Sequence, residues 1–126
     1  MPRTQPPLPV FCDRFQSAIE IIGRRWTGAI LRALMGGATR FGELRTQIPG
    51  MSDRLLSERL KELEAEGLVR REVIADTPVR IEYHLTERGQ ALDGVVREIA
   101  RWVEEWGPRP ADGAPRERVS SRRGSR

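Results

Sequence analysis

Cysteine and histidine are each present only once in this chain of 126 residues, as Cys12 and His84. A lone cysteine excludes an internal disulfide framework and fits a reducing cytoplasm. One histidine and one cysteine cannot supply a structural zinc site, so we expect no metal and no cofactor. His84 has no acidic, thiol or metal-ligating partner at a recognisable spacing, and we expect it to serve packing.

Long hydrophobic runs are also missing. No apolar run approaches the roughly 18 residues of a membrane span. The N-terminal sequence MPRTQPPLPVF lacks the continuous apolar core of a signal peptide. Length and composition therefore predict one domain, located in the cytoplasm and without a membrane partner.

Lysine is scarce as well, because Lys61 is the single lysine among 22 basic side chains. The formal net charge of +4 comes from residues 107–126, which hold six arginines against Asp112 and Glu117. Residues 1–106 are electrically balanced, so net charge is no evidence that the folded part binds DNA. The segment 107–126 is rich in Pro, Gly, Ser and Arg and is predicted to be a disordered tail.

Helical periodicity dominates the N-terminal third of the chain, after a proline-rich arm at 1–12. Apolar residues recur at helical spacing from Asp13 up to Gly23. A second helix follows Trp26 and ends at a pair of glycines, Gly36 and Gly37. We expect one folded domain over residues 13–106.

Two helices separated by a tight turn come next. Thr39 is the expected N-cap of the first, and Pro49 with Gly50 ends it because proline disfavours helix in the preceding residue. Ser52 is the expected N-cap of the second, which ends at Gly67, a residue suited to a left-handed conformation. The apolar positions expected to face the core are Phe41, Leu44, Ile48, Leu56, Leu60 and Leu63.

Two segments with alternating side chains, 69–75 and 79–85, predict strands joined by a turn at 76–78. Pro78 has no N–H to donate, which suits the tip of a hairpin. Two helices across a tight turn, followed by a hairpin, make a winged helix-turn-helix, whose second helix lies in the DNA major groove. The predicted fold class is α+β, mainly helical, with a winged helix-turn-helix DNA-binding domain between N-terminal and long C-terminal dimerisation helices.

A long last helix, capped by Thr86, is predicted before the tail. It carries a stripe of apolar residues three to four positions apart: Leu92, Val95, Val96, Ile99, Trp102, Val103 and Trp106. One small domain does not readily cover such a stripe, so we expect it to pack against a second subunit in a homodimer. The alternative is a helix that folds back on the core of its own chain.

From about Cys12 to Trp106 the sequence resembles HxlR-type winged-helix transcription regulators of bacteria. The matching segments are IGRRWTGAILRAL (22–34), RFGELRTQIPGMSDRLLSERLKELEAEGLVRR (40–71) and PVRIEYHLTERGQAL (78–92). Arg24 and Arg25 stand where the family more usually has Gly-Lys. The resemblance implies a homodimer that binds a near-palindromic operator, and several members of the family respond to aldehydes, quinones or other electrophiles.

The second helix of the pair is the predicted recognition helix. Arg54, in its first turn, is the best candidate for a bidentate contact to guanine O6 and N7, worth ~1–3 kcal/mol of discrimination. Glu58 can accept from cytosine N4, although an Arg54–Glu58 pair on a solvated face is the alternative. Because the chain has no asparagine, readout should rely on Arg, serine hydroxyls and DNA shape. With phosphate contacts from the preceding helix and the hairpin included, the expected DNA-binding residues are Arg40, Arg45, Ser52, Arg54, Ser57, Glu58, Lys61 and Arg80.

Cys12 lies just before a helix N-terminus with Arg14 nearby in sequence, and such surroundings lower a thiol pKa. The resemblance implies that Cys12 is a candidate sensor of electrophiles or oxidants, through alkylation, a mixed disulfide or a bridge to Cys12 of a second subunit. The alternative is a small buried residue. A small-molecule effector bound near Trp26, Tyr83 and Trp102 is equally open.

Three classes of function compete for this sequence. A dimeric DNA-binding regulator is favoured. A winged-helix adaptor that binds proteins would instead show exposed apolar side chains on the recognition helix. An enzyme would need Cys12 as nucleophile and His84 as base, without any glycine-rich phosphate loop or carboxylate pair, and it is the least favoured.

Overall fold

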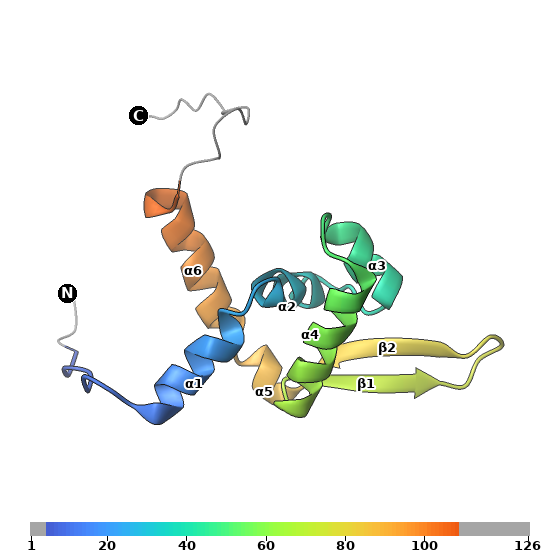
Figure 1. The fold of residues 1–126 in the computed structure, drawn as a ribbon, viewed down its shortest axis with the longest axis horizontal. Helices are drawn as coiled ribbons and strands as arrows, with labels where there is room; N and C mark the ends of the chain where they lie inside the picture. The colour runs from blue at the N-terminus through green and yellow to red at the C-terminus, as the bar shows by residue number, and fades with distance from the viewer. Residues whose placement is uncertain (1–4, 109–126) are drawn as a thin grey trace, which may run out of the picture. The chain divides into compact units, whose positions relative to one another are not determined.

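The computed structural model describes residues 5–108 (Figure 1). Its elements in chain order are α1 (Asp13–Ile22), α2 (Thr27–Met35), α3 (Phe41–Gln47), α4 (Asp53–Ala65), β1 (Val69–Ile74), β2 (Arg80–Leu85), α5 (Glu87–Gln90) and α6 (Asp93–Trp106). The chain divides into two compact units between Val96 and Arg97, inside α6. None of the helices within 5–108 is long and apolar enough to cross a membrane. From residue 109 onward, the predicted tail lies outside the described residues.

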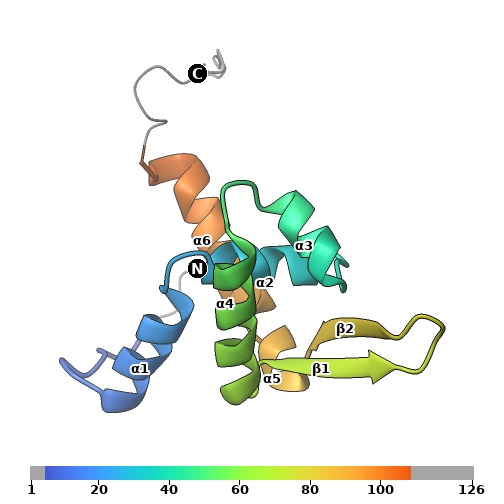
Figure 2. The same ribbon diagram turned by 45° about the vertical axis from the view of Figure 1, so that its right-hand side comes forward.

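Helices α2, α3 and α4 enclose one apolar core (Figures 1 and 2). Its fully buried large side chains are Ile30, Leu31, Leu44, Leu56, Leu60, Leu63 and Val69. The three leucines of α4 lie on one helical face, as their spacing predicted, because residues three and four apart are neighbours on a helix. Each buried leucine contributes roughly 1.5–3 kcal/mol relative to an exposed one. The core therefore fixes which face of α4 points outward.

The start of α3 differs from the prediction by one residue. The N-cap is Arg40 rather than Thr39. The Glu43 carboxylate accepts the backbone N–H of Thr39 at 2.8 Å and that of Arg40 at 3.1 Å. These two bonds, that of Thr39 first, lower the pKa of Glu43. The carbonyl of Thr39 accepts the N–H of Tyr83 at 2.7 Å, so this residue joins the loop to β2 instead of capping the helix.

The bounds of α4 agree with the prediction. Ser52 Oγ accepts the N–H of Leu55 at 3.1 Å and caps the helix. Gly50, in the turn between α3 and α4, has a φ of 92°, and Gly67, just beyond the helix, has a φ of 77°. Glycine adopts these left-handed conformations without the steric cost that a side chain brings. The turn chemistry at both ends thus sets the length and direction of the helix.

Strands β1 and β2 form an antiparallel hairpin, here called the wing (residues 69–85), which projects from the helices in both views (Figures 1 and 2). Val69 pairs with Leu85 and Ile74 pairs with Arg80, so each strand is one residue shorter than predicted. Side chains alternate between the two faces of a strand. The register therefore places the even-numbered residues of both strands on one face of the wing.

The single long helix predicted from Thr86 is wrong, because the chain forms two helices, α5 and α6, in its place. Thr86 caps only the short α5, where its Oγ1 accepts the N–H of Gly89 at 3.1 Å and donates to the carbonyl of Gly67 at 2.6 Å. A Cβ at position 89 would lie 2.1 Å from the carbonyl oxygen of Leu68. Helix α5 is thus held against the start of β1 before α6 begins.

Candidate nucleic-acid interface

The outward face of the recognition helix α4 carries polar side chains. Arg54 is 88% exposed, and its Nε lies 3.3 Å from Glu58 Oε2, one turn along the helix. This is the ion pair expected as the alternative to base contacts. Because solvent screens an exposed pair, it holds Arg54 only weakly. A guanine edge can therefore replace Glu58 as the partner of the guanidinium.

Two more polar residues accompany this pair on α4. Ser57 is half-buried and Lys61 is exposed. The hydroxyl oxygen of Ser52 is used by the helix cap, which leaves its O–H free to donate. Among residues 5–108, the exposed large apolar side chains include none from α4. A surface that docks another protein would show them, so this face suits a charged groove.

Arg40 is the N-cap of α3, whereas Arg45 lies within the last turn of the helix rather than beside it. Arg45 pairs with Asp53 in the first turn of α4 and so connects the two helices across their turn. Arg40 is exposed and lines a shallow pocket together with Pro78 and Arg80 from the end of the wing. The fold therefore brings an arginine of the helix-turn-helix next to the arginine of the wing.

Arg80 is held more firmly than Arg54. Its Nη1 pairs with Asp76 Oδ2, and its Nε donates to Glu82 Oε2 at 3.0 Å. Its side chain is 32% exposed. To reach a phosphate, this guanidinium has to leave or share one of two carboxylates.

Sequence reasoning missed Arg59, which anchors α4 to the chain before α2. Its side chain is only 14% exposed, and its Nε donates to the carbonyl of Arg25 at 3.0 Å. Its Nη1 lies 3.2 Å from Glu62 Oε2, and Glu62 also pairs with Arg24 at 3.1 Å. The helical spacing of Arg59 and Glu62 indicates that these two side chains can pair. Their contacts with Arg25 and Arg24, which lie 34 and 38 residues away, could not be predicted from the sequence.

Cys12 is exposed, so the buried alternative is wrong. It is the N-cap residue of α1. The backbone N–H groups of Phe15 and then Arg14 lower the pKa of its thiol, and the charge of Arg14 acts in the same direction. A larger thiolate fraction at neutral pH makes a cysteine more reactive toward electrophiles.

The predicted dimerisation residues, which are Leu92 just before α6 and six residues within it, are mostly exposed. Leu92 packs partly against the core and Val96 is half-buried. The remaining five large apolar side chains of the stripe are exposed: Val95, Ile99, Trp102, Val103 and Trp106. Helix α1 separately exposes Phe15 and Ile19. Exposed apolar stripes of this kind mark surfaces that a partner covers.

Comparison with known proteins decides the family. The model of the HxlR-like helix-turn-helix family matches residues 21–111, which is more than half of the chain. The chain belongs to the HxlR-like helix-turn-helix family. YvaP, an uncharacterized HTH-type transcriptional regulator of Bacillus subtilis, is 50% identical over 95 residues, covering 75% of this chain and 88% of YvaP.

Solved structures of YodB, a transcriptional regulator of B. subtilis, share the fold. The reduced form matches with a TM-score of 0.70 at 42% identity, over 77% of this chain and 95% of YodB. The quinone-bound form matches with a TM-score of 0.66 at 41% identity, over 76% of this chain and 100% of YodB. This HxlR-like chain is therefore a DNA-binding transcriptional regulator with a winged helix-turn-helix, and not a protein-binding adaptor.

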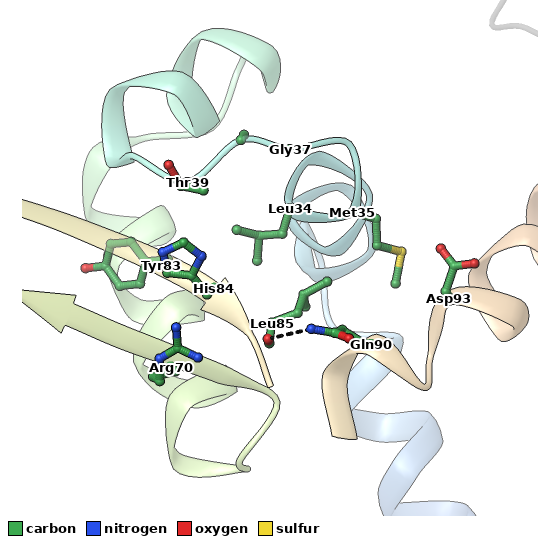
Figure 3. A pocket seen from close by; sticks show the side chains of 11 residues that line it. Leu34, Met35, Gly37, Thr39, Arg70, Tyr83, His84, Leu85, Gln90 and Asp93 are labelled. Carbon is green, nitrogen blue, oxygen red and sulfur yellow. Dashed lines mark hydrogen bonds between the residues drawn. The ribbon is translucent and has the colours of Figure 1, made fainter. Parts of the chain in front are cut away.

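The effector site expected near Trp26, Tyr83 and Trp102 stays a prediction. Tyr83 lines a pocket of about 610 Å³ that also contains Leu34, Met35 and Leu85 (Figure 3). The Trp26 ring instead lies close to Gly50, at the turn between α3 and α4.

The prediction that His84 has no acidic partner is wrong. His84 Nε2 lies 2.9 Å from Glu82 Oε1 and 3.5 Å from Glu72 Oε1. Glu82 shares a strand face with His84 two residues away, and strand pairing places Glu72 opposite Glu82. The spacing within β2 was visible in the sequence, but the register between the strands was not.

Proposed function

We propose that this HxlR-like regulator binds a near-palindromic operator as a homodimer and releases it when Cys12 reacts with an electrophile or an oxidant. The observation that carries the proposal is the outward face of α4. That face is polar, lies opposite a leucine core and presents Arg54 88% exposed in the first helical turn. The N-terminal part of a recognition helix is the part that contacts base edges.

In the complex, α4 occupies the major groove and Arg54 exchanges Glu58 for guanine O6 and N7. Glu58, once released, accepts from a cytosine N4 group. Ser52, Ser57 and Lys61 add hydrogen bonds to bases or phosphates from the same helix. Arg40, Arg45 and Arg80 contact phosphates, which fixes the register of the protein on DNA without reading sequence.

The homodimer explains the exposed apolar residues of α6. Val95, Ile99, Trp102, Val103 and Trp106 would be covered by the partner subunit, with Leu92 and Val96 at the edge of the same stripe. A twofold dimer presents two copies of α4 to half-sites one helical turn, ~34–36 Å, apart. The operator then repeats its half-site in inverted orientation.

Cys12 is the residue that reacts with the electrophile or oxidant. An exposed thiol with a lowered pKa adds as the thiolate to a ring carbon of a quinone, and a proton from solvent completes the adduct. YodB, which shares 42% identity in its reduced form, has also been solved with a quinone bound. This relative supports a quinone as a signal for the present chain.

A fluorescence titration against the DNA upstream of the protein's own gene, at fixed moderate salt, tests the proposal. Specific binding that disappears with a quinone, and survives the quinone in Cys12→Ser, is the expected result. Specific binding that ignores the quinone would exclude Cys12 as the sensor and move the effector to a non-covalent site. Equal affinity for this upstream DNA and for random DNA would show that the upstream DNA does not contain the operator.

A further inference from the structure

Three potential metal ligands converge on one face of the wing. Glu72, Glu82 and His84 each offer one ligand atom, and these atoms all lie within 4.8 Å of one another. We propose that these three side chains bind a divalent transition-metal ion such as Zn²⁺, with the remaining coordination positions open to water. The site lies on the wing, apart from Cys12 and from the outward face of α4.

The distances within the cluster fit metal coordination. Zinc bonds of about 2.0–2.2 Å in a tetrahedral arrangement place neighbouring ligand atoms ~3.3–3.6 Å apart. His84 Nε2 lies 2.9 Å from the nearer Glu82 oxygen and 3.5 Å from the nearer Glu72 oxygen. Small side-chain rotations therefore suffice to admit an ion. A combination of imidazole and carboxylate suits Zn²⁺, Ni²⁺ or Cu²⁺ better than Mg²⁺ or Ca²⁺.

The hairpin holds the ligands in place before an ion arrives. Glu72 pairs directly with Glu82, and Arg70 pairs with His84, so the three ligands occupy adjacent positions of one ladder face. Arg80 Nε donates to Glu82 Oε2 at 3.0 Å and leaves Oε1 directed toward His84. Such an outer hydrogen bond orients a ligating carboxylate and raises metal affinity.

Competition from a neighbouring charge is weak at this site. Arg70 is the competitor, because its Nη2 lies 3.5 Å from Glu72 Oε1. Since both side chains of that pair are about half exposed, it is weak enough for an ion to displace.

Metal binding would change the wing's contact with DNA, a consequence that rests on the proposed function. The ion adds two positive charges to a face whose arginines are balanced by acids, and it frees Arg70 from Glu72. Both changes strengthen attraction to phosphates and steepen the salt dependence of binding. Occupancy of the wing site would thus increase affinity for DNA without altering the base contacts of α4.

Calorimetric titration of the full chain without an affinity tag, using ZnCl₂ alone and no DNA, tests the site directly. We expect one ion per chain and loss of binding in His84→Ala. Glu72→Gln should weaken binding about tenfold or more, since it removes one ligand from an exposed wing position. Matched controls are Glu64→Gln, an exposed carboxylate of α4, and Cys12→Ser, and both should bind as the unaltered chain does.

His84 is the only histidine, so its imidazole NMR signals need no assignment by mutation. These signals should shift with Zn²⁺ in parallel with the calorimetric titration. Unshifted imidazole signals at saturating Zn²⁺, binding that is lost in Cys12→Ser, or full affinity in His84→Ala and Glu72→Gln would each overturn the site. Circular dichroism of each variant separates loss of a ligand from loss of the fold.

A second titration tests separately whether metal binding to the wing changes affinity for DNA. Affinity for random-sequence DNA is measured with and without ZnCl₂ for the unaltered chain and for His84→Ala. A Zn²⁺-dependent rise in affinity only in the unaltered chain supports the coupling. An equal response in both proteins overturns the coupling while the calorimetric result stands. Absence of all DNA binding would count against the proposed function and would leave the metal site intact.

Discussion

The recognition helix α4 and the wing both place arginine beside carboxylates, yet they hold it differently. On α4, Arg54 is 88% exposed and, within residues 5–108, its one ion pair is with Glu58. On the wing, Arg80 is 32% exposed and pairs with both Asp76 and Glu82. An exposed single pair exchanges its carboxylate for a base edge easily, whereas a guanidinium between two carboxylates is part of the folded hairpin. We therefore propose that arginine serves base readout on α4 and mainly structure on the wing.

This difference also separates the two modes of DNA contact. Base contacts need a side chain that leaves its resting partner and meets a specific edge in the groove. Phosphate contacts need only positive potential at the right place. The two regions should consequently respond differently when their arginines are removed.

Arg54→Ala should have the largest effect on function. Loss of a bidentate guanine contact costs about 10- to 100-fold in discrimination per half-site, and a dimer loses it twice. The fold should be unchanged because the side chain is exposed. Competition binding of operator against random DNA measures the ratio, with Arg32→Ala, another exposed arginine, as the matched control. An unchanged ratio would exclude Arg54 as a base reader.

Arg80→Ala should have a smaller effect and one of a different kind. Operator and random DNA should weaken by the same factor, and the slope of log affinity against log salt should fall by about one. The comparison between helix and wing predicts that the ratio of the two affinities stays constant. If Arg80→Ala lowered specificity as much as Arg54→Ala does, the proposal that Arg54 reads bases and Arg80 does not would be wrong.

The parts of the fold that local chemistry determines could be predicted from the sequence. Ser52 caps α4 because its hydroxyl accepts a nearby N–H, and Gly67 ends the helix because glycine adopts a positive φ. The leucine spacing of α4 gave its buried face correctly. At Thr39 the same local reasoning failed, because the helix begins one residue later, with Arg40 as the N-cap and with the N–H groups of Thr39 and Arg40 both bound by the Glu43 carboxylate.

Interactions between distant segments were not predictable in the same way. The contact of Arg59 with the carbonyl of Arg25 and the approach of Glu72 to His84 depend on tertiary placement and strand register. Alternation along β2 shows that Glu82 and His84 share a face, but only the pairing of β1 with β2 adds Glu72 to them. A sequence pattern of period two carries no information on which residue lies opposite.

Ser52→Ala tests whether the helix cap, in addition to the core, positions the start of α4. Removing the hydroxyl that accepts the Leu55 N–H should lower the free energy of unfolding by about 1 kcal/mol. Ser52→Asp keeps an acceptor at the cap and should retain stability. Chemical denaturation of both variants measures the difference. Equal stability of Ser52→Ala and the unaltered chain would show that the core alone positions the helix.

The smallest expected effect is the acid sensitivity that Glu82 gives the wing. Its hydrogen bonds from His84 and then Arg80 lower its pKa in the folded protein below the unfolded value of about 4.3. These interactions therefore stabilise the fold fully above that unfolded value and are lost as the pH falls through the lower folded pKa.

Glu82→Gln should accordingly lower stability at pH 7 and bring the stability of the two proteins closer together as the pH falls below about 4. Denaturation curves across this range measure the difference, with Glu64→Gln on α4 as the control. A constant difference between Glu82→Gln and the unaltered chain at every pH would mean that packing, and not charge, is what Glu82 supplies. A stability difference that becomes smaller at low pH would show that the ionised Glu82 carboxylate stabilises the folded wing, as its place beside Arg80 indicates.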